Sequence, residues 1–160
     1  MRDAFGGEMS RFSILTKYIS MIQSDGIGKW VVEKDNDGLL KHSIQMPFVD
    51  YSEIVRSFID DVYFFEESNR NMILNRYEDI LRKNDIEWTI ESMTKADISN
   101  LNAQCVLALI MGAIRAERFC EGVLLDLFNS GYIVNWLERL NRIEKVGREN
   151  GYNENESSII

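Results

Sequence analysis

The most apolar part of this chain is the run Cys105-Val-Leu-Ala-Leu-Ile-Met-Gly-Ala-Ile114, which contains no charged residue. A helix that is apolar on every side is surrounded by other helices rather than by water. The sequence therefore predicts a helix over residues 101–118 at the centre of a helical bundle. Gly112, which lacks a side chain, leaves room there for a neighbouring element to approach the backbone closely.

On both sides of this central helix, apolar residues recur at three- and four-residue steps, which is the spacing of one helix face. The helices predicted from this spacing cover residues 9–25, 51–66, 70–83, 120–128 and 133–144. The predicted fold class is mainly α with minor β, a compact bundle of about five to six helices around the central helix.

A short β element is expected between the first two of these helices. Strand-forming residues flank the turn sequence Asp35-Asn-Asp-Gly38 and predict a β-hairpin at about 29–46. Pro47 is expected to end the second strand because it has no N–H to donate. Residues 86–90 are either a short strand or an extended connector with Trp88 packed against the body.

The length of 160 residues suits one domain. A folded chain of this size buries about 68–70% of the surface that its unfolded form exposes, enough for a core without a metal or disulfide. We expect a single helical domain over residues 9–146. Residues 1–8 and 147–160 are expected to be a disordered extension and tail because they have too little apolar content to bury, and Met1 and Met9 are both candidate start residues.

The charge balance excludes some partners. With 26 acidic and 18 basic residues the net charge is −8, and the acidic excess lies mainly in residues 51–100. No broad nucleic-acid-binding surface is expected from such a chain. The longest uncharged apolar stretch, 101–114, is shorter than the roughly 20 residues of a membrane span. Since the N-terminus also lacks the apolar run of a signal peptide, the prediction is a cytoplasmic protein with no membrane partner.

Metal, cofactor and nucleophile motifs are sparse. Cys105 and Cys120 lie in apolar segments and are expected to be buried, reduced thiols. Together with His42, the only histidine, they are too far apart in sequence for a structural zinc site. A mechanism of the Ser-His-Asp type would depend on His42 alone. The expectation is no metal and no cofactor, and the sequence leaves open whether the protein is an enzyme.

One charged cluster follows the apolar helix directly. On a continuous helix Arg115, Arg118, Glu121 and Glu117 fall within an arc of about 160° that continues an apolar face. Arginines at a pocket wall suit carboxylate or phosphate groups because the guanidinium offers two parallel donors. The alternatives are a surface Arg118–Glu121 pair and a buried structural network. Ligand binding requires both arginines to face a pocket of at least about 300 Å³.

The predicted helix 51–66 supplies further candidates. Asp60 and Asp61 lie on different faces of it, and Asp61 is the one expected to be partly buried. Asp61, Tyr63 and Trp88 are possible walls of the ligand site. Asp60 and Phe64 are expected on the outer face and are candidates for an interaction surface.

Two parts of the chain resemble a family of small bacterial proteins classed as a domain of unknown function. The resemblance rests on Ile44-Gln-Met-Pro-Phe-Val-Asp-Tyr-Ser-Glu53 with Phe58-Ile-Asp-Asp-Val-Tyr63, and on Ala96-Asp-Ile98 with Leu107-Ala-Leu109 and Ile114-Arg-Ala-Glu-Arg-Phe-Cys-Glu-Gly122. It covers roughly residues 12–140. It implies a single, mostly helical domain from a bacterium or a mobile element, with no substrate and no catalytic residues to carry over.

These observations support two hypotheses about function. The first is a non-enzymatic protein-interaction or regulatory module that contacts another protein, or a second copy of itself, through its acidic helices. The alternative is a protein that binds a small phosphate, carboxylate or nucleotide, or a small enzyme, using the Arg/Glu cluster at 115–121.

Overall fold

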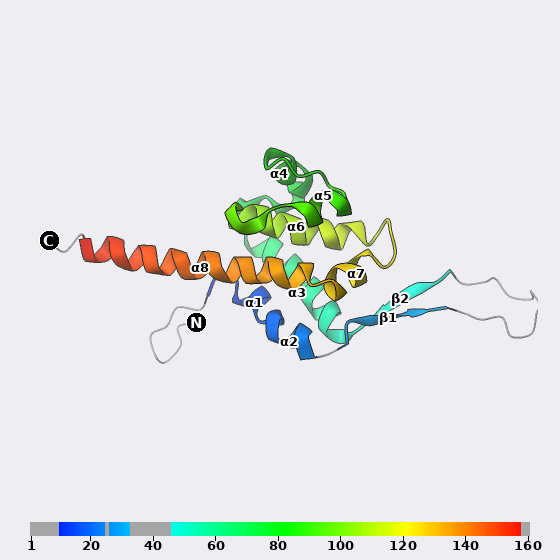
Figure 1. Ribbon diagram of the computed structural model, residues 1–160. Coiled ribbons are helices and arrows are strands. Elements are labelled where there is room, and N and C mark those ends of the chain that lie inside the picture. The colour runs from blue at the N-terminus through cyan, green and yellow to red at the C-terminus, as the bar shows by residue number, and fades with distance from the viewer. Residues whose placement is uncertain (1–9, 25, 33–45, 158–160) are drawn as a thin grey trace, which may run out of the picture.

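The computed structural model describes residues 10–24, 26–32 and 46–157. It confirms the fold class: helices form the body, and a small antiparallel sheet projects from it (Figure 1). The helical elements are α1 (Ser13–Thr16), α2 (Tyr18–Ser24), α3 (Glu53–Ser68), α4 (Tyr77–Lys83), α5 (Ile90–Lys95), α6 (Ala103–Ala116), α7 (Val123–Asn129) and α8 (Tyr132–Ser157), with 3₁₀ turns η1 (Arg70–Met72), η2 (Leu74–Arg76) and η3 (Ile98–Asn100).

Helix α6 is the central element, as the sequence predicts. Asn102 caps its N-terminus by accepting the N–H of Cys105 at 2.9 Å. Every residue from Cys105 to Ile114 is buried, and the helix packs against α4, α7 and α8. Its C-terminal end lies at Ala116, two residues before the predicted end at 118.

The close approach expected at Gly112 is also confirmed. The indole of Trp88 lies over Gly112, and its Nε1–H donates to the Gly112 carbonyl at 2.9 Å. A Cβ at this position would lie 3.3 Å from Cδ1 of Trp88. Residues 86–90 are predicted to be either a strand or a connector. The structure shows a connector, which leads into α5 at Ile90.

Helix α3 forms close to the predicted range 51–66, but it begins and ends two residues later, at Glu53 and Ser68. Ser52 is its N-cap and accepts the N–H of Val55. The buried face of α3 carries Val55, Phe58, Val62 and Phe65. The ring of Phe58 contacts those of Tyr18 and Phe128 edge-on, with ring centroids 5.3 Å and 5.6 Å apart. These contacts join α2, α3 and α7 across the core.

The helix predicted over 70–83 is interrupted. Residue Ile73 has the left-handed backbone angles φ 47° and ψ 42°, and the chain forms η1 and η2 on its two sides before α4 begins. Met72 and Leu74 are both buried although they are only two residues apart. Residues at that spacing point in nearly opposite directions on an α-helix. The left-handed residue turns the chain so that both side chains reach the core.

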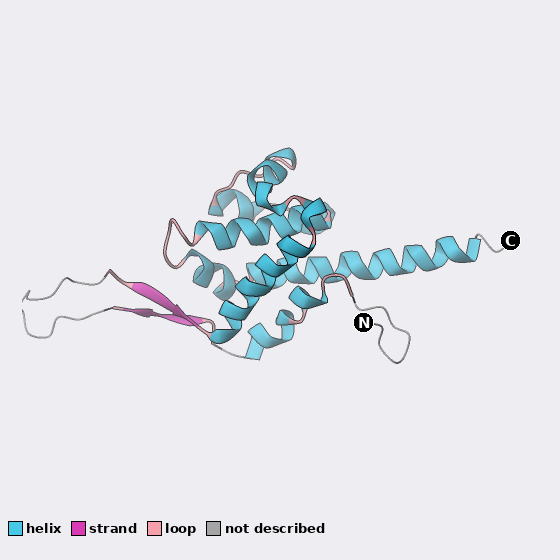
Figure 2. Cartoon of the chain, turned by 180° about the vertical axis from the view of Figure 1, so that it is seen from behind, coloured by secondary structure: helices cyan, strands magenta, loops and turns pink. Residues whose placement is uncertain are grey.

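The sheet consists of β1 (Gly28–Val31) paired antiparallel with β2 (Phe48–Tyr51), and Trp30 lies opposite Val49 (Figure 2). The first strand agrees with the prediction. Most of the predicted second strand lies outside the described residues, as do the turn and His42. Pro47 precedes a strand instead of ending one, a position it tolerates because the first residue of an edge strand need not donate an N–H.

The long helix α8 closes the body on one side and extends beyond it (Figure 1). Glu144 accepts hydrogen bonds from the Ser10 hydroxyl and the Phe12 N–H, and so ties the start of the described chain to α8. Residues 147–157 continue this helix where the sequence predicted a disordered tail. Extending an existing helix costs far less than nucleating one, because each further residue adds one backbone hydrogen bond. The predicted extension 1–8 lies outside the described residues.

No helix of the described chain combines the length and the apolar character needed to cross a membrane.

Candidate functional site

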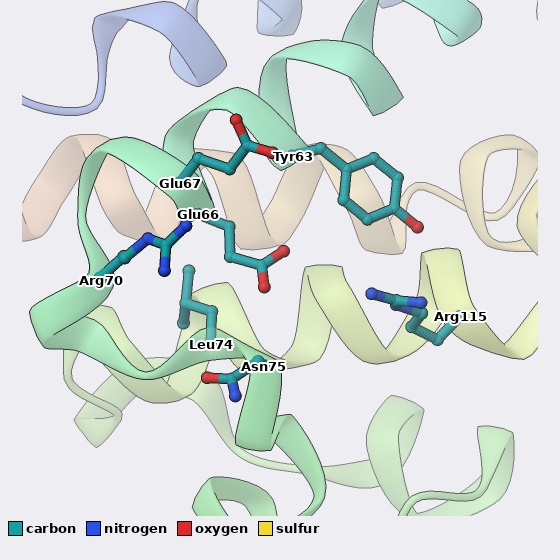
Figure 3. Close-up of a pocket in the computed structure, with 7 residues that line it drawn as sticks. All are labelled: Tyr63, Glu66, Glu67, Arg70, Leu74, Asn75 and Arg115. Atoms are coloured by element: carbon teal, nitrogen blue, oxygen red, sulfur yellow. The ribbon is translucent and has the colours of Figure 1, made fainter.

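A pocket of about 510 Å³ lies between the end of α3, the η1–η2 segment and the last turn of α6 (Figure 3). Its volume falls within the range of small-molecule sites, roughly 300–1,000 Å³. The pocket is lined by Tyr63, Glu66, Glu67, Arg70, Leu74, Asn75 and Arg115. Most of these side chains are polar or charged, so the pocket suits a polar ligand.

Arg115 is the lining residue with the most unusual environment. It lies in the last turn of α6, half-buried, and its guanidinium carbon is 5.3 Å from the ring centroid of Tyr63. Its Nε is buried and has no hydrogen-bond partner among the described residues. Arginine keeps its charge in proteins, and a buried donor without an acceptor is costly. The Tyr63 ring thus positions the guanidinium, and the Nε–H of Arg115 donates to no acceptor among the described residues.

The other charged side chains of the pocket come from α3 and η1 and lie on the side away from Arg115. Figure 3 shows Glu66 reaching into the pocket from α3 toward the side on which Arg115 lies, with Arg70 and Glu67 at the other end. Within the described chain, none of these four charged groups forms a salt bridge. The lining therefore holds two positive and two negative groups that are not paired with one another.

The predicted cluster at 115–121 does not stay together. The prediction of one continuous helical arc is wrong, because α6 ends at Ala116 and the chain turns before α7 begins at Val123. Arg115 faces the pocket, whereas Arg118 is exposed and does not line it. The two glutamates point elsewhere. The condition that both arginines face one pocket is therefore not met, and the ligand site predicted at 115–121 does not form; the pocket beside Arg115 is a different site, built mainly from α3 and the η1–η2 segment.

Glu117 belongs to a hydrogen-bond network that caps α7. Its Oε1 accepts the Tyr51 hydroxyl at 2.7 Å and the Gly122 N–H at 2.9 Å, and its Oε2 accepts the Leu124 N–H at 2.8 Å. The Tyr51 oxygen in turn accepts the Leu125 N–H at 3.0 Å. Burial, followed by the hydrogen bond to Glu117, raises the pKa of Tyr51 well above its ordinary value. This arrangement corresponds to the structural network considered as an alternative for the cluster.

Glu121 and Asp61 are also occupied by contacts within the chain. Glu121 accepts the N–H of Val49 at 2.9 Å and so holds β2 against the loop before α7. Asp61 is partly buried, as expected, and accepts the Tyr18 hydroxyl at 2.5 Å while Lys17 lies 3.2 Å away. Asp61 does not line the Arg115 pocket.

The two surface candidates on α3 lie where the sequence placed them. Asp60 is exposed, and Phe64 is 59% exposed, which is high for an aromatic side chain. Whether a partner binds there stays a prediction.

Trp88 lines a second, mainly apolar pocket of about 290 Å³ and not the Arg115 pocket. The exposed ring of Phe119 contacts Trp88 at this pocket, with ring centroids 5.9 Å apart. Cys120, which also lines it, is exposed, so the expectation of a buried thiol there is wrong. Cys105 is buried as expected, and burial raises its pKa to about 11.

Sequence reasoning missed Glu66, Glu67, Arg70 and Asn75. The sequence did contain a pattern that could have identified the first three. Tyr63, Glu66, Glu67 and Arg70 are spaced three to four residues apart along a helix, so they lie on one side of α3 and of the η1 turn that follows it. Asn75 carried no such signal, since its position depends on the turn at Ile73. In the described parts of the chain, no three His, Cys, Asp or Glu side chains are grouped to hold a metal ion.

The sequence profile of a family of unknown function, DUF6508, matches residues 9–146. The expected resemblance over about 12–140 is thereby confirmed, over a slightly longer range. No curated protein and no solved structure matches the chain.

Proposed function

We propose that this chain, which belongs to the DUF6508 family over residues 9–146, is a small-ligand-binding protein whose site is the Arg115 pocket. The ligand carries a carboxylate or phosphate group that the Arg115 guanidinium binds. The observation that carries this proposal is that Arg115 lines a pocket of about 510 Å³ and forms no salt bridge within the described residues, while its buried Nε also lacks an acceptor there.

The surroundings of Arg115 support anion binding in particular. The Tyr63 ring, 5.3 Å from the guanidinium carbon, restrains the guanidinium by a cation–π contact that uses none of its N–H donors. Asn75 and the Tyr63 hydroxyl add neutral donors to the lining. A carboxylate or phosphate that meets a guanidinium edge-on forms paired, charge-assisted hydrogen bonds.

A comparison of two arginines tests the proposal. Arg115→Met removes the charge and keeps most of the aliphatic stem, and Arg118→Met makes the same change three residues away, outside the pocket. Wild type and both variants are screened by thermal shift against carboxylates, inorganic phosphate and nucleotides, and hits are measured by calorimetry. A ligand at 100 times its Kd stabilises the folded state by about 2.7 kcal/mol.

The expected result is a ligand that stabilises wild type and Arg118→Met but not Arg115→Met. A ligand that stabilises Arg115→Met as strongly as wild type would place the binding elsewhere. The absence of any anionic ligand for wild type would refute the proposal.

The exposed face of α3 favours a second candidate function, that of a non-enzymatic interaction or regulatory module. Phe64 is 59% exposed beside the exposed Asp60. An exposed aromatic residue next to a carboxylate suits a partner with an apolar and a basic group. The partner is another protein or a second copy of the chain.

A Phe64→Ala, Asp60→Lys double variant tests this second function. Partners recovered with the wild-type protein from its host should be lost with the variant, and light scattering measures whether the chain self-associates. Retention of every partner and of the same molar mass would remove this face as the contact.

We also propose that the protein works in the cytoplasm of a bacterium. The resemblance to bacterial proteins supports this origin, and two free cysteines are ordinary in a reducing compartment.

A further inference from the structure

We infer that the ligand of the Arg115 pocket carries a cationic group as well as an anionic one and belongs to the class of amino-acid-like zwitterions. This inference rests on the proposed function, since it concerns the same pocket. It goes beyond it by naming the class of ligand, and it depends on a second set of residues, the carboxylates of Glu66 and Glu67.

The charge of the lining argues against a purely anionic ligand. Two guanidiniums, of Arg70 and Arg115, and two carboxylates, of Glu66 and Glu67, line the pocket. A multiply charged anion such as a nucleotide phosphate would be attracted by the two guanidiniums but repelled by the two carboxylates. A ligand with one charge of each sign is complementary to both.

The positions of these side chains place the binding of the ligand's anionic group and of its cationic group at different parts of the pocket. Figure 3 shows the carboxylate of Glu66 directed into the space between α3 and Arg115. The anionic end of a ligand would therefore lie against Arg115, with Tyr63 and Asn75 as neutral donors. The ammonium end would lie against the Glu66 carboxylate, which reaches toward Arg115 and away from the Arg70 guanidinium at the other end of the pocket.

Both ends of this site are held by well-ordered packing. Tyr63 and Glu66 lie one turn apart on α3, whose adjacent face is anchored in the core by Val62 and Phe65. Arg115 follows the fully buried part of α6. Groups placed on two packed helices keep their separation, which is the condition for selecting a ligand by the distance between its charges.

The shape of the pocket agrees with a compact zwitterion that has room for a side chain. At about 510 Å³ it exceeds what a molecule of the size of glycine fills. Leu74 provides one buried apolar wall. An amino acid with a partly apolar side chain would contact that wall while its charged groups meet Arg115 and Glu66.

The test uses three matched sets of probes measured by calorimetry at neutral pH. The first set contains the α-amino acids and the unbranched ω-amino acids from glycine to 6-aminohexanoate. The second contains the corresponding acids without the amino group, and the third the corresponding amines without the carboxylate. The proteins are wild type, Arg115→Met, Glu66→Gln and, as a control, Glu53→Gln, which changes an exposed acid at the other end of α3.

At least one zwitterion should bind wild type about tenfold or more tightly than its matched acid and its matched amine. Glu66→Gln should abolish this preference for the zwitterion while leaving the binding of the matched acid unchanged or stronger. Arg115→Met should weaken both the zwitterion and the acid, and Glu53→Gln should behave as wild type.

The outcomes separate this inference from the proposed function. Acids that bind wild type as tightly as the zwitterions, with no effect of Glu66→Gln, would overturn the inference and leave the proposed function standing. If none of the probes binds, and phosphates and nucleotides do not bind either, both are overturned. Circular dichroism of each variant shows whether a loss of binding comes from a loss of fold.

Discussion

Arg115 and Glu117 lie two residues apart at the end of α6, and the structure uses them in opposite ways. Glu117 accepts three hydrogen bonds, from Tyr51, Gly122 and Leu124, so its carboxylate is used to stabilise the fold. Arg115 has a buried Nε with no acceptor in the described chain and borders a pocket. A charge whose bonds are all made within the chain stabilises it, whereas a charge left without partners costs stability and is available to a ligand.

The largest effect expected from this comparison is that of Glu117→Ala. The substitution leaves the N–H groups of Gly122 and Leu124 and the Tyr51 hydroxyl without their acceptor, at a cost of about 3 kcal/mol in the free energy of unfolding. Urea denaturation followed by circular dichroism measures it. Arg115→Met is the matched control, and its cost should stay below about 1 kcal/mol because no hydrogen bond is lost. Equal losses in the two variants would remove the distinction between them.

Gly122→Ala is expected to cost about 2 kcal/mol. Gly122 has a φ of 93°, and a Cβ there would lie 2.3 Å from Cζ2 of Trp30. The change therefore adds backbone strain and pushes the β-hairpin away from the loop that Glu117 organises. Repeating it in a Trp30→Ala background should recover part of the loss, as measured by a double-mutant cycle. No recovery would show that the contact with Trp30 carries no energy.

Tyr51→Phe should cost about 1.5 kcal/mol at neutral pH, because it removes the hydroxyl that links Glu117 to the N–H of Leu125. The pKa of Tyr51 is raised by burial and then by Glu117 above the ordinary value of about 10. Its contribution to stability is thus fully present below the unfolded-state pKa and is lost as the pH rises through the folded-state pKa.

Alkaline titration of stability checks this sign. Wild type should lose more free energy of unfolding than Tyr51→Phe between about pH 9 and pH 11. Tyr18, whose pKa is also raised by burial and by Asp61, contributes equally to both proteins and cancels in the difference. Parallel curves would mean that Tyr51 ionises as easily in the folded as in the unfolded chain.

The smallest effect, of opposite sign, is expected at Ile73, which precedes the lining residues Leu74 and Asn75 of the Arg115 pocket. A β-branched residue with φ 47° is strained, and its side chain is 44% exposed. Ile73→Asn should stabilise the fold by about 0.5 kcal/mol, because asparagine adopts the left-handed region more readily. Ile73→Val, which keeps the strain, should give no gain. A loss in the asparagine variant larger than in the valine variant would show that the Ile73 side chain, and not its backbone, matters.

The parts of the fold that sequence reasoning predicted well are those with a strong local signal. The uncharged run from Cys105 to Ile114 indicated a central helix, and the helical spacing of Phe58, Val62 and Phe65 placed α3 to within a few residues. The break at Ile73 could not be seen because its apolar neighbours look like a helix face, and only their packing on two sides of the turn reveals it.

The candidate site was predicted in part. Arg115 was identified because it follows the apolar run directly, and Tyr63 as a possible wall. The error was to extend the helix through 117–121. Glu117 lies at the C-terminal end of α6 and accepts hydrogen bonds from the N–H groups at the start of α7. The spacing of apolar residues along a helix does not predict such a contact.

The amino-acid sequence by itself determined the helical class, the central helix and the division of α3 into a buried and an exposed face. These features follow from side-chain polarity and its period along the chain, which are local properties. Only the tertiary structure decided that Glu66 and Asn75 would share a pocket with Arg115, and that Glu117 would instead cap α7. The physical reason is that these contacts join residues far apart in the sequence. Tyr51 and Glu117 are 66 positions apart, and Glu66 and Asn75 are 49 and 40 positions from Arg115. Contacts at that separation are set by how the helices pack and not by the spacing within any one of them.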